Sequence, residues 1–120
     1  MAHETAHVLS TSTLIDTKVV NRDGEDLGKI EDLMLDVGEG YVAYAVLSFG
    51  GFLGMGERLF LVPWSHLRVE QDERRIIVDL PRAALEQAPG FDRDHWPNMA
   101  DTSWREEVDS HYRRVGDSGP

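Results

Sequence analysis

The stretch that decides the fold of this 120-residue chain reads Asn21-Arg-Asp-Gly-Glu-Asp-Leu-Gly28, and it continues through residues 29–37 and 41–49. Asp23-Gly24 predicts a tight hairpin turn, because glycine accepts the positive φ that such a turn demands. Apolar residues on either side of the turn predict strands over residues 17–21 and 27–37. The centre of the chain is therefore expected to be a small β-domain.

One irregularity in the second of these strands predicts a β-bulge. Leu33, Leu35 and Val37 share one parity, whereas Ile30 lies on the other. A strand with one buried face changes parity only through an extra residue, so we expect a bulge near Glu31-Asp32. Such a bulge lets a sheet bend sharply enough to close into a small barrel.

The longest expected strand, residues 41–49, carries apolar side chains on both faces. It is therefore either covered on both sides or awaits a partner. The glycine-rich residues 50–56 that follow lack the Gly-Lys-Ser/Thr ending of a phosphate loop, and a strand is expected after them. These residues are predicted to be a hairpin connection.

The remaining pattern predicts a mainly β fold of six short antiparallel strands closed into a small barrel. A capped helical turn after Ser10 precedes the first strand. Residues 59–62 form the fourth strand, and Pro63 ends it and begins one helical turn. Residues 67–69 and 75–80 pair across a polar turn at 71–74.

The composition changes after residue 80, where a helical C-terminal extension is expected. Pro81 begins a short helix that Pro89-Gly90 ends. Asp101 is a candidate N-cap for a helix over residues 102–115. One stripe of this helix contains Trp104, Val108, Tyr112 and Val115, and such a stripe docks more often on its own domain than on a ligand. The predicted units are a disordered tail (1–8), the barrel (9–80), the extension (81–115) and a second tail (116–120).

Composition and charge exclude several classes of function. With 22 acidic and 12 basic residues the formal charge is −10, which opposes binding of a nucleic-acid backbone. The chain contains no cysteine, so disulfides, thiolate zinc sites and cysteine nucleophiles are excluded. No signal peptide or membrane-spanning run is visible, and we expect a cytoplasmic protein without membrane insertion.

No set of residues specifies a reaction, and no catalytic residue, metal site or cofactor is predicted. His3-Glu-Thr-Ala-His7 matches the H-E-x-x-H pattern of zinc proteases, but no apolar stripe beside it indicates the helix that this chemistry requires. Ser65 and His66 are neighbours in sequence and would not face each other on a helical turn. His66 is expected in a packed corner beside Trp64, and His95 and His111 are expected on the surface.

Four short segments together resemble the PRC-barrel family. They are Val19-Val-Asn-Arg-Asp-Gly24, Leu27-Gly-Lys-Ile-Glu-Asp32, Tyr44-Ala-Val46 and Leu61-Val-Pro-Trp64. The resemblance covers about residues 8–80 and implies a small six-stranded barrel. Family members resemble the cytoplasmic domain of the photosynthetic reaction-centre H subunit and the C-terminal domain of a ribosome maturation factor. In both contexts the module is a platform for protein docking, and only this theme carries over.

We therefore expect a non-enzymatic protein-interaction module that forms a homodimer or a larger assembly, with another protein as a further partner. Large aromatic and apolar side chains dominate interface energies. The expected contact residues are Tyr44, Phe49, Phe52, Leu53, Phe60, Trp96, Trp104 and Tyr112. The alternative is a regulatory domain that binds a small ligand or a metal through the acidic turns or the loop at residues 50–56.

Overall fold

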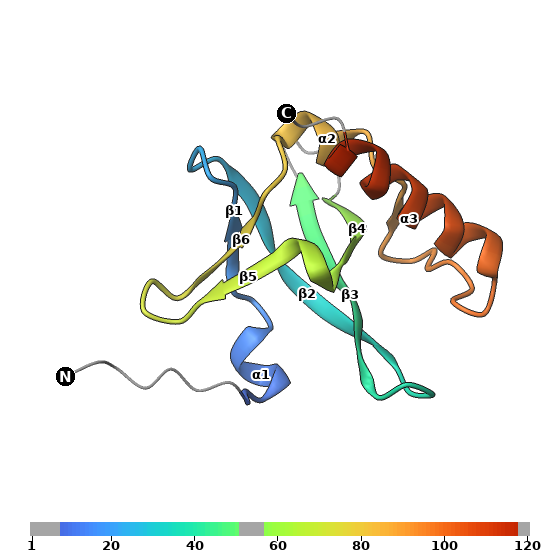
Figure 1. Ribbon diagram of the computed structural model, residues 1–120, viewed down its shortest axis with the longest axis horizontal. Helices are drawn as coiled ribbons and strands as arrows, with labels where there is room; N and C mark the ends of the chain where they lie inside the picture. The colour runs from blue at the N-terminus through green and yellow to red at the C-terminus, as the bar shows by residue number, and fades with distance from the viewer. Residues whose placement is uncertain (1–7, 51–56, 118–120) are drawn as a thin grey trace.

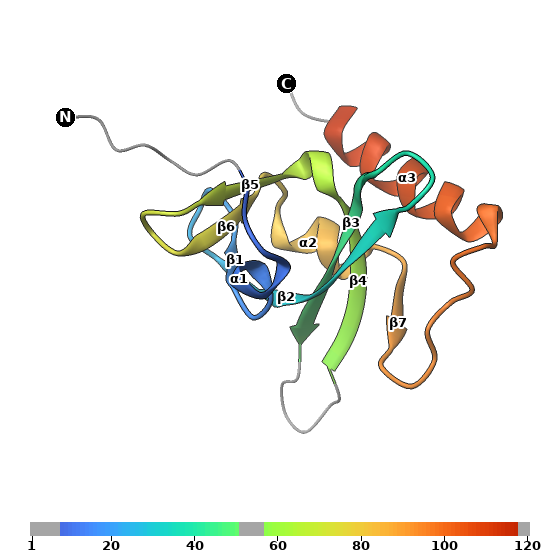
Figure 2. The same ribbon diagram turned by 90° about the horizontal axis from the view of Figure 1, so that it is seen from below.

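Two long antiparallel strands, β2 (Asp26–Asp36) and β3 (Tyr41–Gly50), form the centre of the sheet (Figure 1). The structure is a computed structural model that describes residues 8–50 and 57–117. Within these residues, seven strands lie in the order β5-β6-β1-β2-β3-β4-β7. Figure 2 shows that this sheet is strongly curved.

The first strand, β1 (Lys18–Val20), follows a single helical turn, α1 (Thr11–Leu14), and ends at the turn that the sequence predicts. Gly24 adopts a φ of +82°. Asn21 is only 4% exposed, and its Oδ1 accepts hydrogen bonds from the backbone N–H groups of Asp23 and Glu25. Its Nδ2 donates to the Leu80 carbonyl at 3.3 Å, which ties the turn to the end of the barrel region.

The predicted bulge in β2 is confirmed, and two further irregularities accompany it. One lies on the facing strand, where Ala43 of β3 is skipped between the pairs Met34–Tyr44 and Leu35–Val42. On β2 itself, the register against β3 skips Glu31 and the register against β1 skips Leu27. These extra residues bring Leu27, Ile30 and Leu33 into the core at a spacing of three residues. The expectation built on parity fails beyond Leu33, because the outer end of the hairpin extends past the segments that cover the sheet.

Strand β3 is covered on both faces over residues 44–49, all of which are buried. It pairs with β4 (Glu57–Pro63), after which the turn of helix predicted at Pro63 forms as η2 (Trp64–His66). The predicted hairpin of β5 (Leu67–Glu70) and β6 (Arg75–Val78) is confirmed. Leu85 of α2 (Arg82–Glu86) joins the same core.

The C-terminal extension belongs to the same fold as the sheet. Strand β7 (Gly90–Asp92) pairs with β4, and α3 (Thr102–Asp117) packs against β4. Asp101 caps α3, since its Oδ1 accepts the Ser103 N–H at 3.0 Å. Hydrogen bonds from Ser103 hold the pKa of the Asp101 carboxyl below its usual value. The helix therefore docks on its own sheet.

The prediction of a closed six-stranded antiparallel barrel is wrong in three respects. Over the described residues the sheet has seven strands, β1 pairs with β6 in parallel, and the order leaves β5 and β7 as edges of an open sheet. The sequence predicts a loop where the seventh strand lies, because the three residues of β7, which begin at Gly90 itself, are too few for an alternating pattern. The parallel pairing of β1 with β6 cannot be predicted from either segment, because the two strands contain only three and four residues.

Candidate interaction surface

Four of the expected contact residues lie in the core. Tyr44, Phe49, Phe60 and Tyr112 are all less than 10% exposed. The Phe49 and Phe60 rings meet edge to face at 6.0 Å between centroids. Phe52 and Leu53 lie outside the described residues. Tyr44, Phe49, Phe60 and Tyr112 therefore stabilise the fold and offer no free surface, because α2, α3 and neighbouring strands cover them.

Helix α3 accounts for much of this burial. The Tyr44 hydroxyl donates to Asp109 Oδ1 at 2.8 Å, and the Tyr112 ring lies 5.8 Å from the His66 ring. The latter contact confirms the packed corner expected for His66. The prediction that His111 lies on the surface is wrong. His111 is 8% exposed, and its Nε2 lies 2.9 Å from the Ala84 carbonyl oxygen. Because a carbonyl oxygen only accepts hydrogen bonds, Nε2 carries the hydrogen and donates it.

Trp96 and Trp104 both pack against Phe91, beside the N-terminal end of α3. The ring of Phe91, from β7, lies 4.9 Å from Trp96 and 5.9 Å from Trp104. Trp104 packs partly against the core, whereas Trp96 is 40% exposed. Of the eight expected contact residues, these two lie nearest to solvent among those that the structure describes. Phe91 is the residue that unites them.

The most exposed large hydrophobic side chains of the described residues, apart from the N-terminal segment, lie at the end of the β2–β3 hairpin. Leu35 is 58% exposed, Val37 89% and Tyr41 57%. The hairpin projects beyond the rest of the sheet (Figure 1). We call Leu35, Val37 and Tyr41 the hairpin patch. The sequence contains a signal for this patch, because its residues flank the turn Gly38-Glu39-Gly40. At such a turn the end of a long hairpin extends beyond the segments that cover the sheet.

A hollow of about 210 Å³ lies beside the hairpin patch, between the hairpin and the start of α3. Its lining consists of Met34, Leu35, Asp36, Val37, Gly38, Ala43, Tyr44, Met99 and Arg105. The Nε of Arg105 is buried and has no hydrogen-bond partner among the described residues. Burial and the hydrogen bond to Asp109 raise the pKa of the Tyr44 phenol, while the charge of Arg105 opposes that rise. The phenol is therefore neutral at physiological pH.

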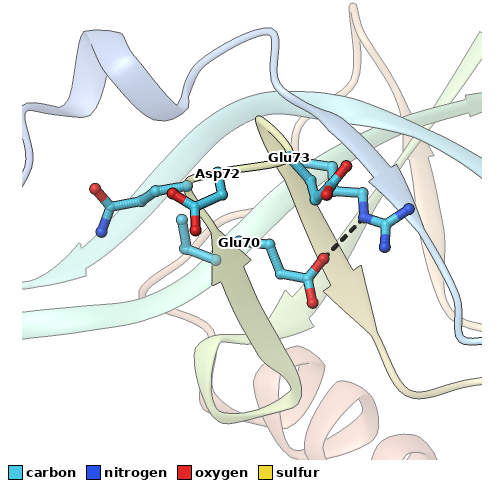
Figure 3. A pocket seen from close by; sticks show the side chains of 6 residues that line it. Glu70, Asp72 and Glu73 are labelled. Carbon is cyan, nitrogen blue, oxygen red and sulfur yellow. Dashed lines mark hydrogen bonds and ion pairs between the residues drawn. The ribbon is translucent and has the colours of Figure 1, made fainter. Parts of the chain in front are cut away.

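A second hollow, of about 400 Å³, lies at the β5–β6 turn (Figure 3). Its acidic residues are Glu70, Asp72 and Glu73, whose carboxylates are spread along the turn and do not converge. Glu70 accepts a hydrogen bond from Arg75 Nε at 2.8 Å, and this bond raises the pKa of the Arg75 guanidinium. This arrangement is a solvated turn with one internal ion pair.

Within residues 8–50 and 57–117, no three histidine or acidic side chains gather where they could hold a metal ion. The H-E-x-x-H segment at His3 and His7 and the glycine-rich loop at 51–56 lie outside that part of the chain. None of the described helices is long and apolar enough to cross a bilayer.

Comparison with known proteins identifies the family. No curated protein matches the chain. The family model of the PRC-barrel domain matches residues 7–85, more than half of the sequence. This range contains the Asp23-Gly24 turn, the bulged β2 strand, the doubly covered β3 strand and the Pro63-Trp64 corner. The chain therefore belongs to the PRC-barrel domain family.

Proposed function

We propose that this chain is a non-enzymatic protein-interaction module that self-associates through the end of the β2–β3 hairpin. The observation that carries the proposal is the hairpin patch, in which Leu35, Val37 and Tyr41 are each more than half exposed. Leu35 pairs with Val42 and Asp36 with Tyr41, so Leu35 and Tyr41 lie on opposite faces of the hairpin. Exposed apolar side chains at a projecting tip cost free energy in water, and a protein partner removes that cost.

Two further features support an interaction at this end of the molecule. The patch borders the hollow that Met99 and Arg105 line, so this surface is concave as well as apolar. Trp104, which directly precedes Arg105, carries the aromatic cluster with Trp96. Aromatic residues and arginine are enriched at the energetic centres of interfaces. The contact surface proposed here thus keeps Trp96 and Trp104 of the expected set and adds the hairpin patch.

The test compares the absolute mass of two variants by light scattering over a range of concentrations. Val37→Asp places a charge in the patch and should weaken self-association about thirtyfold or more, the effect of losing about 2 kcal/mol. Ala83→Asp adds the same charge at an exposed position of α2 and should leave the association unchanged.

A native chain that stays monomeric at the highest concentration would contradict self-association. Equal behaviour of the two variants would place the interface elsewhere. Truncation near residue 80 is a poor test, because it would remove Phe91, Val108 and Tyr112 from the core and expose what they cover.

A further inference from the structure

The hollow beside the hairpin patch combines apolar walls with one cation. Met34, Ala43 and Met99 supply apolar surface, and Arg105 supplies the charge. Arg105 forms no ion pair within the described residues, and its buried Nε lacks an acceptor there. An arginine that lines a hollow without a carboxylate partner favours an anionic group there, because hydrogen bonds between a guanidinium and a carboxylate are among the strongest in proteins.

The two carboxylates near this site are already engaged in other contacts. Asp36 Oδ1 accepts the backbone N–H groups of Gly38 and Glu39 at 3.0 and 2.9 Å, and so fixes the turn. Asp109 Oδ1 accepts the Tyr44 hydroxyl at 2.8 Å, which holds α3 against β3. The occupant that fits the hollow therefore presents an apolar side chain together with a carboxylate of its own.

The hairpin turn of the same chain has this chemistry. Val37 is 89% exposed, and Glu39, two residues later, is also exposed. Glu39 forms no ion pair within residues 8–50 and 57–117. The turn projects beyond the rest of the sheet (Figure 1).

We infer that a second copy of this chain occupies the hollow, with its Val37 against the apolar walls and its Glu39 carboxylate on the Arg105 guanidinium. The hairpin turn and the hollow share Val37 and Gly38, so the donor and receptor surfaces are contiguous. A two-fold axis near the hairpin then makes both contacts reciprocal, as in most dimers of identical chains. This inference rests on the proposed function and deepens it by naming the hollow that receives the hairpin turn and the charge pair.

A charge reversal tests the pair directly in the full-length chain. Glu39→Arg and Arg105→Glu should each weaken the dimer by at least about tenfold, because like charges would then meet across the contact. The double variant restores opposite charges and should return the dissociation constant to within about threefold of the native value. Glu73→Arg, at the exposed β5–β6 turn, is the matched control and should leave the association unchanged.

Each result distinguishes this inference from the proposed function. If Val37→Asp weakens the dimer and the double reversal restores nothing, the Glu39–Arg105 pair is wrong while the hairpin surface stands. If all variants associate like the native chain, both proposals fail, and a monomeric native chain also overturns both. Should Arg105→Glu fail to fold, Glu39→Gln and Arg105→Gln replace it, and their combination should then cost no more than either alone.

Discussion

Gly28 allows strands β2 and β3 to approach closely near the start of β2. Its φ is +103°, a backbone conformation that residues with a side chain rarely adopt. A Cβ built at this position would lie 1.9 Å from the Ser48 carbonyl oxygen, which belongs to the backbone and cannot turn aside. The position therefore requires glycine for two independent reasons.

Substitution Gly28→Ala should lower the free energy of unfolding by at least about 2 kcal/mol, from backbone strain and the clash with β3 together. Gly40→Ala is the control, because Gly40 also has a positive φ (+80°) but a Cβ added there would meet no heavy atom within 4 Å. Denaturation with urea measures both. Equal losses in the two variants would show that the close approach to Ser48 contributes nothing.

Tyr112 buries a hydroxyl group for which the described residues provide no hydrogen-bond partner. Tyr112→Phe should therefore preserve the fold and raise the free energy of unfolding by about 1 kcal/mol, since it removes an unsatisfied polar group. Tyr44→Phe breaks the bond to Asp109 and should lower it by about the same amount. A loss of stability in Tyr112→Phe, measured by thermal and urea unfolding, would contradict this account.

The same hydroxyl makes stability sensitive to alkaline pH. Burial raises the pKa of Tyr112 above the ordinary value of 10.0, so the folded chain keeps a proton that the unfolded chain releases. The free energy of unfolding is therefore independent of this group below the unfolded pKa of 10.0, and it falls as the pH rises from there through the pKa of the folded state. Tyr112→Phe should reduce the slope of stability against pH in that alkaline range by one proton.

Helix α3 shows what a sequence pattern can predict about an element. The stripe of Trp104, Val108 and Tyr112 predicts both the helix and the face that docks, and the structure confirms both. The same pattern cannot place His111, because histidine is intermediate between the residue types that are usually buried and those that are usually exposed. Its contact with Ala84 depends on α2, whose position follows from the whole fold.

The docking of α3 has a measurable energetic consequence. Val108 is completely buried, so Val108→Ala should lower the free energy of unfolding by about 2 kcal/mol through lost burial and the remaining cavity. Glu107→Ala, one position away on the exposed side, should change it by less than about 0.5 kcal/mol. If both variants unfold alike, α3 does not contribute to the core in solution.

At the scale of the whole molecule, local signals suffice for elements and do not suffice for their assembly. Turns, the bulge at Glu31 and the β5–β6 hairpin depend on neighbouring residues, and the sequence predicts them. The parallel pairing of β1 with β6 and the addition of β7 to β4 depend on distant segments. Burial depends on the same distant contacts: four of the expected contact residues, Tyr44, Phe49, Phe60 and Tyr112, lie in the core.

The ion pair between Glu31 and Arg93 extends this long-range organisation. Arg93 Nη1 and Nη2 lie 2.6 and 3.2 Å from the two carboxylate oxygens of Glu31, the bulge residue. The irregular point of β2 is thereby joined to the turn after β7. The family match ends at residue 85, yet the structural unit includes α3, so the extension is as much a part of the core as the strands.

The parallel pair of β1 and β6 also determines the order in which the chain can fold. Val19 pairs with Ile76, so one side of β1 stays without its neighbour until most of the polypeptide has left the ribosome. The β2–β3 hairpin needs only adjacent residues and can form early, whereas contacts between distant segments form slowly. Synthesis from the N-terminus thus yields a hairpin first and a complete sheet last, and the aggregation-prone interval is the time that β1 waits for β6.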